Sequence, residues 1–177
     1  MKSQTVINAL KESIREIQDF PKPGINFYDI TTLLKKKEGF RQIIDLIYEK
    51  FKDEKIDYVV SIESRGFIFG SALAYKFNAG FVPIRKKGKL PAATYSVSYD
   101  LEYGQDTLEI HTDAIEEGKN ILLVDDLLAT GGTVRAAADL CRKNGANIIS
   151  LVFLIELTFL GARSKLSDLP VTSLLAY

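Results

Sequence analysis

The sequence predicts an α/β fold, in which a central, mainly parallel sheet is flanked by helices. Short apolar runs alternate along the chain with longer segments of helical periodicity, and turns rich in glycine and polar residues separate them. This alternation is typical of parallel strands whose connecting helices cover both faces of the sheet. Because 177 residues suffice for one well-buried core, we expect a single domain, residues 1–177.

The first third of the chain predicts two helices and the first strand of the sheet. Apolar residues recur at helical spacing in residues 5–17, and this segment stops before the stiff turn Phe20-Pro-Lys-Pro-Gly24. The same spacing in residues 40–51 predicts a second helix, and the β-branched run 58–62 predicts a buried strand. We call residues 1–35, with boundaries uncertain by a few residues, the N-terminal hood.

The rest of the chain continues the alternation, apart from one long insertion. Alternating apolar and polar residues in 95–101, and again in 108–110, predict a flexible two-stranded flap at about residues 86–110. The other predicted elements are a helix at 67–77, a strand at 81–84, a strand at 121–124, a helix at 134–143 closed by Gly145, and a strand at 148–155 followed by a polar C-terminal segment.

The composition argues against several functional classes. The 23 basic and 23 acidic residues balance, so neither nucleic acid nor an anionic membrane is expected as the main partner. With no leader sequence and no membrane-length apolar run, we expect a cytoplasmic protein. His111 and Cys141, each the only residue of its type, cannot build a usual zinc site, and no Walker lysine, nucleophile elbow or dinucleotide fingerprint is visible.

Residues 121–133 are the most informative segment, because an apolar strand ends in Asp125 and Asp126 and leads through a small-residue turn into a helix. The turn consists of Ala129, Thr130, Gly131, Gly132 and Thr133. Its glycines let backbone N–H groups face a ligand, its threonines add hydroxyl donors, and the helix dipole favours an anion. A phosphate monoester would fit there, with the two acids near sugar hydroxyls or hydrated magnesium. Acid pairs alone are common at the start of a solvated loop.

Two further polar runs follow predicted strands. Glu63-Ser-Arg-Gly66 lies at the carboxyl end of its strand, as the acid pair does, so both turns should open on one edge of the sheet. Arg85, Lys86 and Lys89 form a cationic run suited to neutralising a departing diphosphate. By itself, the first run could be an ordinary turn with an exposed arginine, and the second a solvated charge cluster.

The run from Ile121 to Thr133 resembles the PRPP-binding motif of type I phosphoribosyltransferases. Three other segments are similar to the adenine-specific branch of that family: Phe20–Ile30, Leu101-Glu-Tyr-Gly104 and Glu156-Leu-Thr158. In order and spacing the resemblance covers nearly the full length. It implies the type I phosphoribosyltransferase fold with its hood and flap, and transfer of a phosphoribosyl group from PRPP to adenine, giving AMP and pyrophosphate with Mg²⁺.

The resemblance also implies roles for individual residues. Glu102 would be the catalytic residue that accepts or donates a proton at the nucleobase. General acid–base catalysis of this kind contributes roughly 100- to 10,000-fold in rate. PRPP and AMP would bind to Asp125, Asp126, Ala129, Thr130, Gly131, Gly132 and Thr133. Pyrophosphate would bind to Ser64, Arg65, Arg85, Lys86, Lys89 and Tyr103. Adenine would bind to Asn26, Phe27, Tyr28 and Arg65. The resemblance further implies a homodimer in which the cationic run serves the neighbouring subunit, and a pyrophosphate loop that often holds a cis peptide.

One departure keeps alternatives open. Members of the adenine-specific branch often carry arginine where this chain has Tyr28, so a phosphoribosyltransferase for another nucleobase stays possible. A second alternative is a PRPP or nucleotide sensor without catalysis. A sensor would be expected to have an appended basic domain and a degraded flap, and this sequence shows neither.

Overall fold

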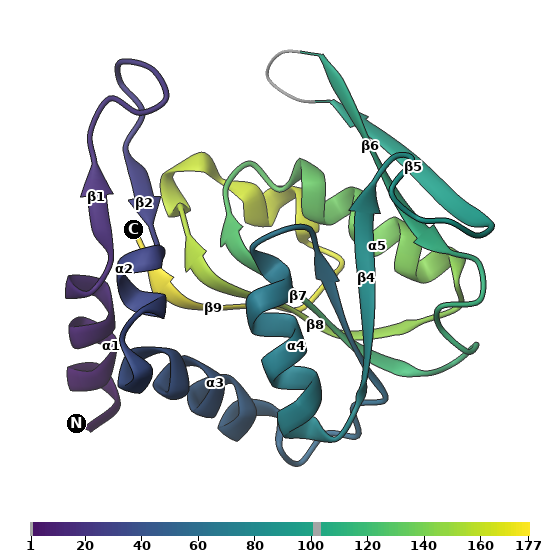
Figure 1. The fold of residues 1–177 in the computed structure, drawn as a ribbon, viewed down its shortest axis with the longest axis horizontal. Coiled ribbons are helices and arrows are strands. Elements are labelled where there is room, and N and C mark those ends of the chain that lie inside the picture. The colour runs from purple at the N-terminus through teal and green to yellow at the C-terminus, as the bar shows by residue number, and fades with distance from the viewer. Residues whose placement is uncertain (1, 101–103) are drawn as a thin grey trace. The chain divides into compact units, whose positions relative to one another are not determined.

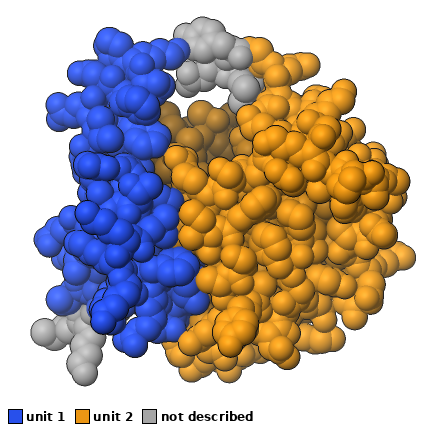
Figure 2. Space-filling model, viewed as in Figure 1, with its two compact units in different colours: residues 1–47 blue, residues 48–177 orange. Residues whose placement is uncertain are grey.

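The computed structural model describes residues 2–100 and 104–177, which divide into two compact units, residues 1–47 and 48–177 (Figure 2). The elements are α1 (Lys2–Glu12), β1 (Arg15–Ile17), β2 (Phe27–Asp29), α2 (Thr31–Leu34), α3 (Lys37–Phe51), β3 (Tyr58–Ile62), α4 (Gly66–Phe77), β4 (Gly80–Lys86), β5 (Thr94–Asp100), β6 (Gln105–His111), β7 (Asn120–Leu128), α5 (Gly132–Lys143), β8 (Asn147–Glu156), the 3-10 helices η1 (Thr158–Leu160) and η2 (Ala162–Leu166), and β9 (Val171–Ala176). The prediction of a single domain stays a prediction.

The second unit contains a seven-stranded sheet, in the order β5-β6-β4-β3-β7-β8-β9 (Figure 1). The five strands from β4 to β9 in this order run parallel, whereas β6 pairs antiparallel with both β4 and β5. The predicted α/β class is therefore confirmed. The β5–β6 hairpin supplies the two strands predicted for the flap.

Helices α4 and α5 cover opposite faces of this sheet, α4 in front of it and α5 behind it in Figure 1. Side chains alternate along β3, as the period of a strand requires. Val60 and Ile62 belong to the same buried cluster as Ala137 of α5, whereas the side chain of Ser61 lies against Gly70 of α4. Because both faces are covered, the central strands are mostly apolar and buried, and Ser61 of β3 is one of the few buried polar residues among them.

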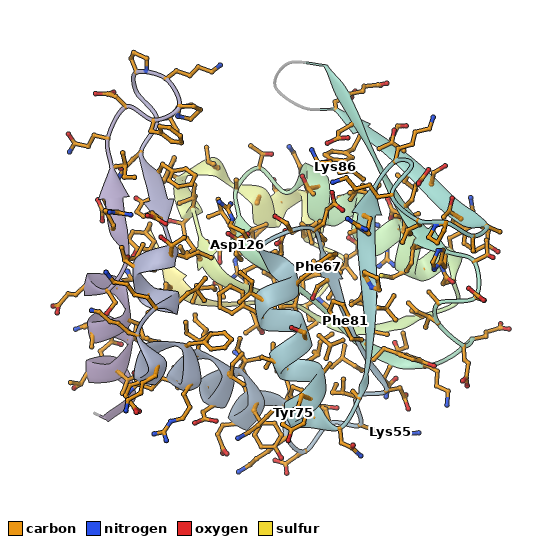
Figure 3. All side chains as sticks on the ribbon, viewed as in Figure 1. Lys55, Phe67, Tyr75, Phe81, Lys86 and Asp126 are labelled. Atoms are coloured by element: carbon orange, nitrogen blue, oxygen red, sulfur yellow. The ribbon has the colours of Figure 1, made fainter. Side chains whose placement is uncertain are left out.

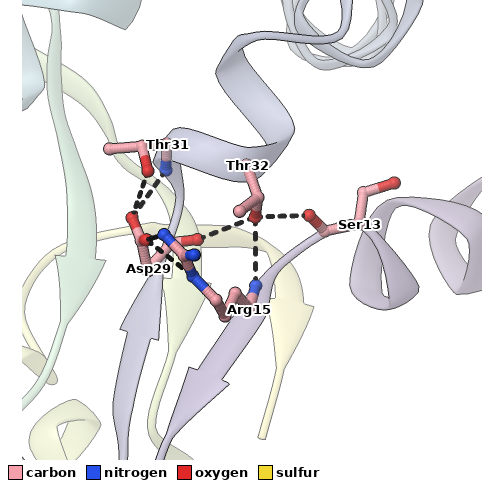
Figure 4. A network of polar contacts seen from close by, with 5 residues as sticks. All are labelled: Ser13, Arg15, Asp29, Thr31 and Thr32. Atoms are coloured by element: carbon pink, nitrogen blue, oxygen red, sulfur yellow. Dashed lines mark hydrogen bonds and ion pairs between the residues drawn. The ribbon is translucent and has the colours of Figure 1, made fainter.

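The first unit contains a small antiparallel sheet of β1 and β2, in the register Arg15 with Asp29 and Ile17 with Phe27. The helix predicted for residues 5–17 was therefore wrong at its end, because α1 stops at Glu12 and the last three of these residues pair with β2. Figure 4 shows the polar contacts that hold this sheet. Arg15 forms an ion pair with Asp29, whose other oxygen accepts hydrogen bonds from the backbone and hydroxyl of Thr31 at 2.9 and 2.6 Å.

Two further differences from the predictions concern the length and number of strands. β7 runs to Leu128, so Asp125 and Asp126 lie within the strand and not after it, because β7 pairs with β8 as far as Glu156. The segment predicted to be polar contains β9, which pairs in parallel with β8. Among the described residues, no helix has the length and apolar character needed to cross a membrane.

Candidate active site

The turn between β7 and α5 forms the phosphate loop, residues 129–133. Gly131 precedes the helix with a φ of +84°, and a Cβ atom there would lie 3.3 Å from Ala162, so the position suits glycine. Arg135 makes the first helical hydrogen bond back to the Gly131 carbonyl, at 3.0 Å. Within the described residues, no side chain caps the start of α5. The first backbone N–H groups of the helix are therefore available to an anion.

A half-buried carboxylate, Asp125, and a buried one, Asp126, precede this loop. Asp126 has 6% of its surface exposed, and its backbone N–H donates to Oδ1 of Asp125 at 2.9 Å. Burial raises the pKa of both groups; the charge of Asp126 raises the pKa of Asp125 further, and Arg65 opposes the rise. The Arg65 Nε atom lies 2.6 Å from Oδ2 of Asp126. Residues predicted to bind PRPP and pyrophosphate are thus in direct contact.

The turn after β3 approaches the acid pair closely. A Cβ atom on Gly66, where α4 begins, would lie 2.8 Å from Oδ1 of Asp125 and 3.1 Å from the carbonyl of Val124. Only glycine lets this turn come so near to β7. The peptide bond between Glu63 and Ser64 is cis, a feature that the sequence alone could not reveal.

Both turns open on one cavity of about 420 Å³, a volume within the range of small-molecule sites. Its lining residues are Ile62, Glu63, Ser64, Arg65, Lys86, Tyr99, Leu108, Asp125, Asp126, Leu127, Ala129, Thr130, Thr133 and Val134. Figure 3 shows Lys86 and Asp126 near the end of the sheet at which the parallel strands finish. This location agrees with the rule that open α/β sheets bind ligands at the carboxyl ends of their strands.

The structure divides the cationic run between two partners. Arg85 and Lys89 both contact the carboxylate of Glu63, at 2.7 and 2.5 Å, and neither of them is among the cavity-lining residues. Burial raises the pKa of Glu63, but its bonds to Lys89 and Arg85 lower it by more. Lys86 does line the cavity, and its Nζ atom lies 2.9 Å from Oδ2 of Asp106.

Tyr99 of β5 is a cavity residue that the sequence argument missed as part of the site. Burial raises the pKa of its hydroxyl, and a polar interaction with Thr133 opposes the rise. The alternation of the flap strand indicated which face this residue is on, but no sequence signal indicated that this face would meet the phosphate loop. β5 approaches the loop so closely that a Cβ on Gly132 would lie 3.6 Å from the carbonyl of Asp100.

Three of the four residues predicted to bind adenine, Asn26, Phe27 and Tyr28, lie on the β1–β2 hairpin of the first unit, whereas Arg65 lies directly before α4 in the second unit. Phe27 packs edge-to-face against Phe20, with ring centroids 5.2 Å apart. Asn26 donates to Glu16 at 3.2 Å, and its Oδ1 atom is buried with no hydrogen-bond partner in the described part of the chain. Tyr28 lies opposite Glu16 in the register of the two strands. The predicted base-contacting Glu102 and the predicted pyrophosphate-binding Tyr103 lie outside the described residues.

The acid pair also determines how the site could hold a metal ion. Asp125 and Asp126 supply the hard oxygen donors that Mg²⁺ prefers. In the described ranges, no group of three or more His, Cys, Asp and Glu side chains is arranged to hold a metal ion. Two carboxylates fit an ion that takes its remaining ligands from water and from substrate phosphates.

Comparison with known proteins gives consistent results. The family model described as "Phosphoribosyl transferase domain" matches residues 29–171. The adenine phosphoribosyltransferase of Acidobacterium capsulatum is 60% identical over 168 residues, which cover 95% of this chain and 93% of that protein. The crystal structure of adenine phosphoribosyltransferase from Thermoanaerobacter pseudethanolicus superposes with a TM-score of 0.93 at 49% identity, covering 97% of this chain and 99% of that one.

A third relative has been solved with ligands. The adenine phosphoribosyltransferase of Saccharomyces cerevisiae, complexed with adenine and an imino-altritol bisphosphate, superposes with a TM-score of 0.92 at 41% identity. The match covers 97% of this chain and 99% of that structure.

Proposed function

Since the chain belongs to the phosphoribosyl transferase family, we propose that it is a purine salvage enzyme that transfers the 5-phosphoribosyl group of PRPP to adenine, giving AMP and pyrophosphate. The observation that carries this proposal is the meeting of the phosphate loop, the acid pair and the Glu63–Gly66 turn in one cavity. A single ligand with a phosphate at one end and a diphosphate at the other would reach all three.

The phosphate loop binds the 5-phosphate of PRPP. The uncapped start of α5 offers backbone N–H groups, and the hydroxyls of Thr130 and Thr133 line the same cavity. Asp125 and Asp126 accept hydrogen bonds from the ribose hydroxyls. Arg65 lies 2.6 Å from Asp126, so the guanidinium stands between the acid pair and the diphosphate side of the cavity and can exchange this contact for the substrate.

The opposite side of the cavity neutralises the diphosphate. Ser64, Arg65 and Lys86 line this side, and Arg85 and Lys89 lie beside it on Glu63. Mg²⁺ bound together with the diphosphate would offset its charge and make it a better leaving group. The side chains that would hold the ion are Asp125 and Asp126, through water or through the ribose.

The reaction needs no covalent nucleophile from the protein. The transition state places positive charge on the ribose ring and negative charge on the leaving diphosphate, so charges fixed at both ends lower the barrier. Asn26, Phe27 and Tyr28 of the hood hold the base, largely through backbone groups. Glu102 accepts or shares the ring proton of the base, for which about 100- to 10,000-fold in rate is typical.

A panel of bases tests this proposal. PRPP and Mg²⁺ are offered with adenine, hypoxanthine, guanine, xanthine or orotate, and the products are resolved by chromatography. We expect AMP from adenine and no nucleotide from the other bases. Turnover with another base would overturn the base assignment, and PRPP binding without turnover would indicate a sensor. An Asp126→Asn variant serves as the control, with strongly weakened PRPP binding expected.

Two parts of the proposal concern the cell and the assembly. We place the enzyme in the cytoplasm as a homodimer, as its resemblance to the family implies. In this dimer Arg85 and Lys89, the two residues of the cationic run that do not line the cavity of their own chain, act at the neighbouring active site. A dimer doubles the 19.7 kDa mass of the chain, which light scattering measures directly. Mixing Arg85→Ala protein with Asp125→Asn protein should restore activity if the run acts across the dimer, since some mixed dimers then carry one intact site.

A further inference from the structure

Both basic side chains among the described cavity residues are already paired with an acid of the same chain. Arg65 lies 2.6 Å from Asp126, and Lys86 lies 2.9 Å from Asp106. An anionic ligand therefore meets cations whose charge is partly neutralised. Asp126 has an evident second use, because it belongs to the acid pair of the cavity. Asp106 is not among the residues that line the cavity.

Asp106 is held firmly in its place on β6. Its Oδ1 atom accepts a hydrogen bond from the backbone N–H of Thr107 at 2.8 Å, and its Oδ2 atom faces Lys86. Tyr99 is its directly opposite neighbour on β5. The side chain of Asp106 is 22% exposed, whereas that of Lys86 is 55% exposed. The acid is therefore the fixed partner and the lysine is the one that can move.

We propose that Asp106 is an internal counter-ion that competes with the diphosphate of the ligand for Lys86 and thereby sets the affinity of the site for pyrophosphate. This inference rests on the proposed function, in which Lys86 neutralises the diphosphate. When the ligand binds, Nζ of Lys86 exchanges the carboxylate for phosphate oxygens. When pyrophosphate leaves, Asp106 takes the lysine back, while its bond to the backbone of Thr107 keeps it in position.

The size of the effect follows from the exposure of the pair. Ion pairs near the surface contribute little, because solvent screens them and the long side chain loses freedom. The corresponding range of about 0.2–1 kcal/mol equals an affinity change of about 1.5- to 5-fold. Asp106→Asn keeps the shape of the side chain and removes its charge. Lys86 can then bind the diphosphate without first breaking an ion pair.

The test is the affinity for magnesium pyrophosphate, measured by calorimetry without adenine or turnover. We expect Asp106→Asn to bind it about 1.5- to 5-fold more tightly than the unsubstituted protein. Asp100→Asn is the matched control, because Asp100 is an exposed acid of the same hairpin that bonds to Gln105 instead of a cavity lysine. It removes the same charge and should change the affinity less.

A double-mutant cycle separates competition for Lys86 from a general change in charge. In a Lys86→Met background, Asp106→Asn should no longer tighten binding; an undiminished gain there would overturn the inference. Weaker binding by Asp106→Asn alone would also overturn it, since Asp106 would then hold Lys86 where the ligand needs it. If AMP forms but Asp106→Asn binds pyrophosphate as the unsubstituted protein does, only the inference fails. If neither protein binds pyrophosphate, the diphosphate assignment in the proposed function fails with it.

Discussion

Burial and the neighbouring charge of Asp126 raise the pKa of Asp125, so the folded protein binds a proton at this carboxyl more tightly than the unfolded chain does. The ionised group therefore opposes folding at pH values above its folded pKa, and this penalty fades as the pH falls. Arg65 offsets the charge only in part, through its contact with Asp126. The site thus keeps carboxylates where ligand binding, and not folding, makes use of them.

We predict that Asp125→Asn stabilises the protein while lowering its activity. The amide retains an oxygen that can accept the backbone N–H of Asp126, and the substitution removes one of two adjacent carboxylate charges. A gain of about 1 kcal/mol would raise Tm by about 2–4 °C in a chain of this size. Thermal unfolding at pH 8 and at pH 4.5 measures the effect. The gain should shrink at the lower pH; a Tm at pH 8 below that of the unsubstituted protein would contradict the prediction.

At the scale of single elements, the packing of α4 on the sheet depends on Gly70. A Cβ atom there would lie 1.7 Å from the Ser61 hydroxyl oxygen and 3.2 Å from the Phe81 ring. The helix therefore lies closer to β3 than any side chain would allow. This approach also holds the start of α4 beside Asp125, where Gly66 is in contact with β7.

Gly70→Ala should destabilise the protein although alanine is the better helix former. Alanine favours a helix over glycine by about 1 kcal/mol, but overpacking a core typically costs about 1–3 kcal/mol, and the clash with Ser61 is severe. Urea unfolding measures the loss. Ser71→Ala, at an exposed position of the same helix, is the control and should stay within about 0.5 kcal/mol. Adding Ser61→Gly to Gly70→Ala should restore part of the stability; no recovery would mean that the clash is not the cause.

The β1–β2 hairpin should contribute an acid-sensitive part of the stability. Hydrogen bonds from Thr31 and the contact with Arg15 lower the pKa of Asp29 from 3.8 to about 2. A lowered folded pKa means that the stabilisation is present above pH 4 and is lost as the pH falls towards 2. Asp29→Asn should lower the urea midpoint at pH 6 and make its decrease between pH 4 and pH 2 shallower. The control is Asp113→Asn, at an exposed position. If the urea midpoint of Asp29→Asn fell between pH 4 and pH 2 as steeply as that of this control, the assignment would be contradicted.

At the scale of the whole molecule, occupancy of the cavity should stabilise the fold by mass action. PRPP at about 100 times its Kd contributes about 2.7 kcal/mol, which corresponds to a rise in Tm of about 5–11 °C for a chain of this size. Thermal unfolding with and without PRPP and Mg²⁺ measures it. The Asp126→Asn protein at the same PRPP concentration is the control and should show a much smaller rise. If PRPP raised Tm equally in both proteins, the acid pair would not contribute to PRPP binding, and this prediction would be wrong.

The sequence determined the elements whose signals are local. The spacing of apolar residues and the length of each apolar run were sufficient to predict β3 and α4, because an apolar run between turn-forming residues is compatible with few other structures. The acid pair and the phosphate loop could be recognised for the same reason, since the two acids and the glycines and threonines of the loop lie in one short segment, residues 125–133. The chemistry of a phosphate site at a helix start needs only one segment of chain.

What only the tertiary structure decided are the contacts between segments distant in sequence. Pairing with β2 turned Arg15–Ile17 from helix to strand, and pairing with β8 extended β7 through the acid pair. The roles of Tyr99 and Asp106 depend on the register of a hairpin and on its approach to the phosphate loop. Such contacts arise from packing and hydrogen bonding across the sheet, whose free energy outweighs local propensity, and no single segment of the sequence encodes them.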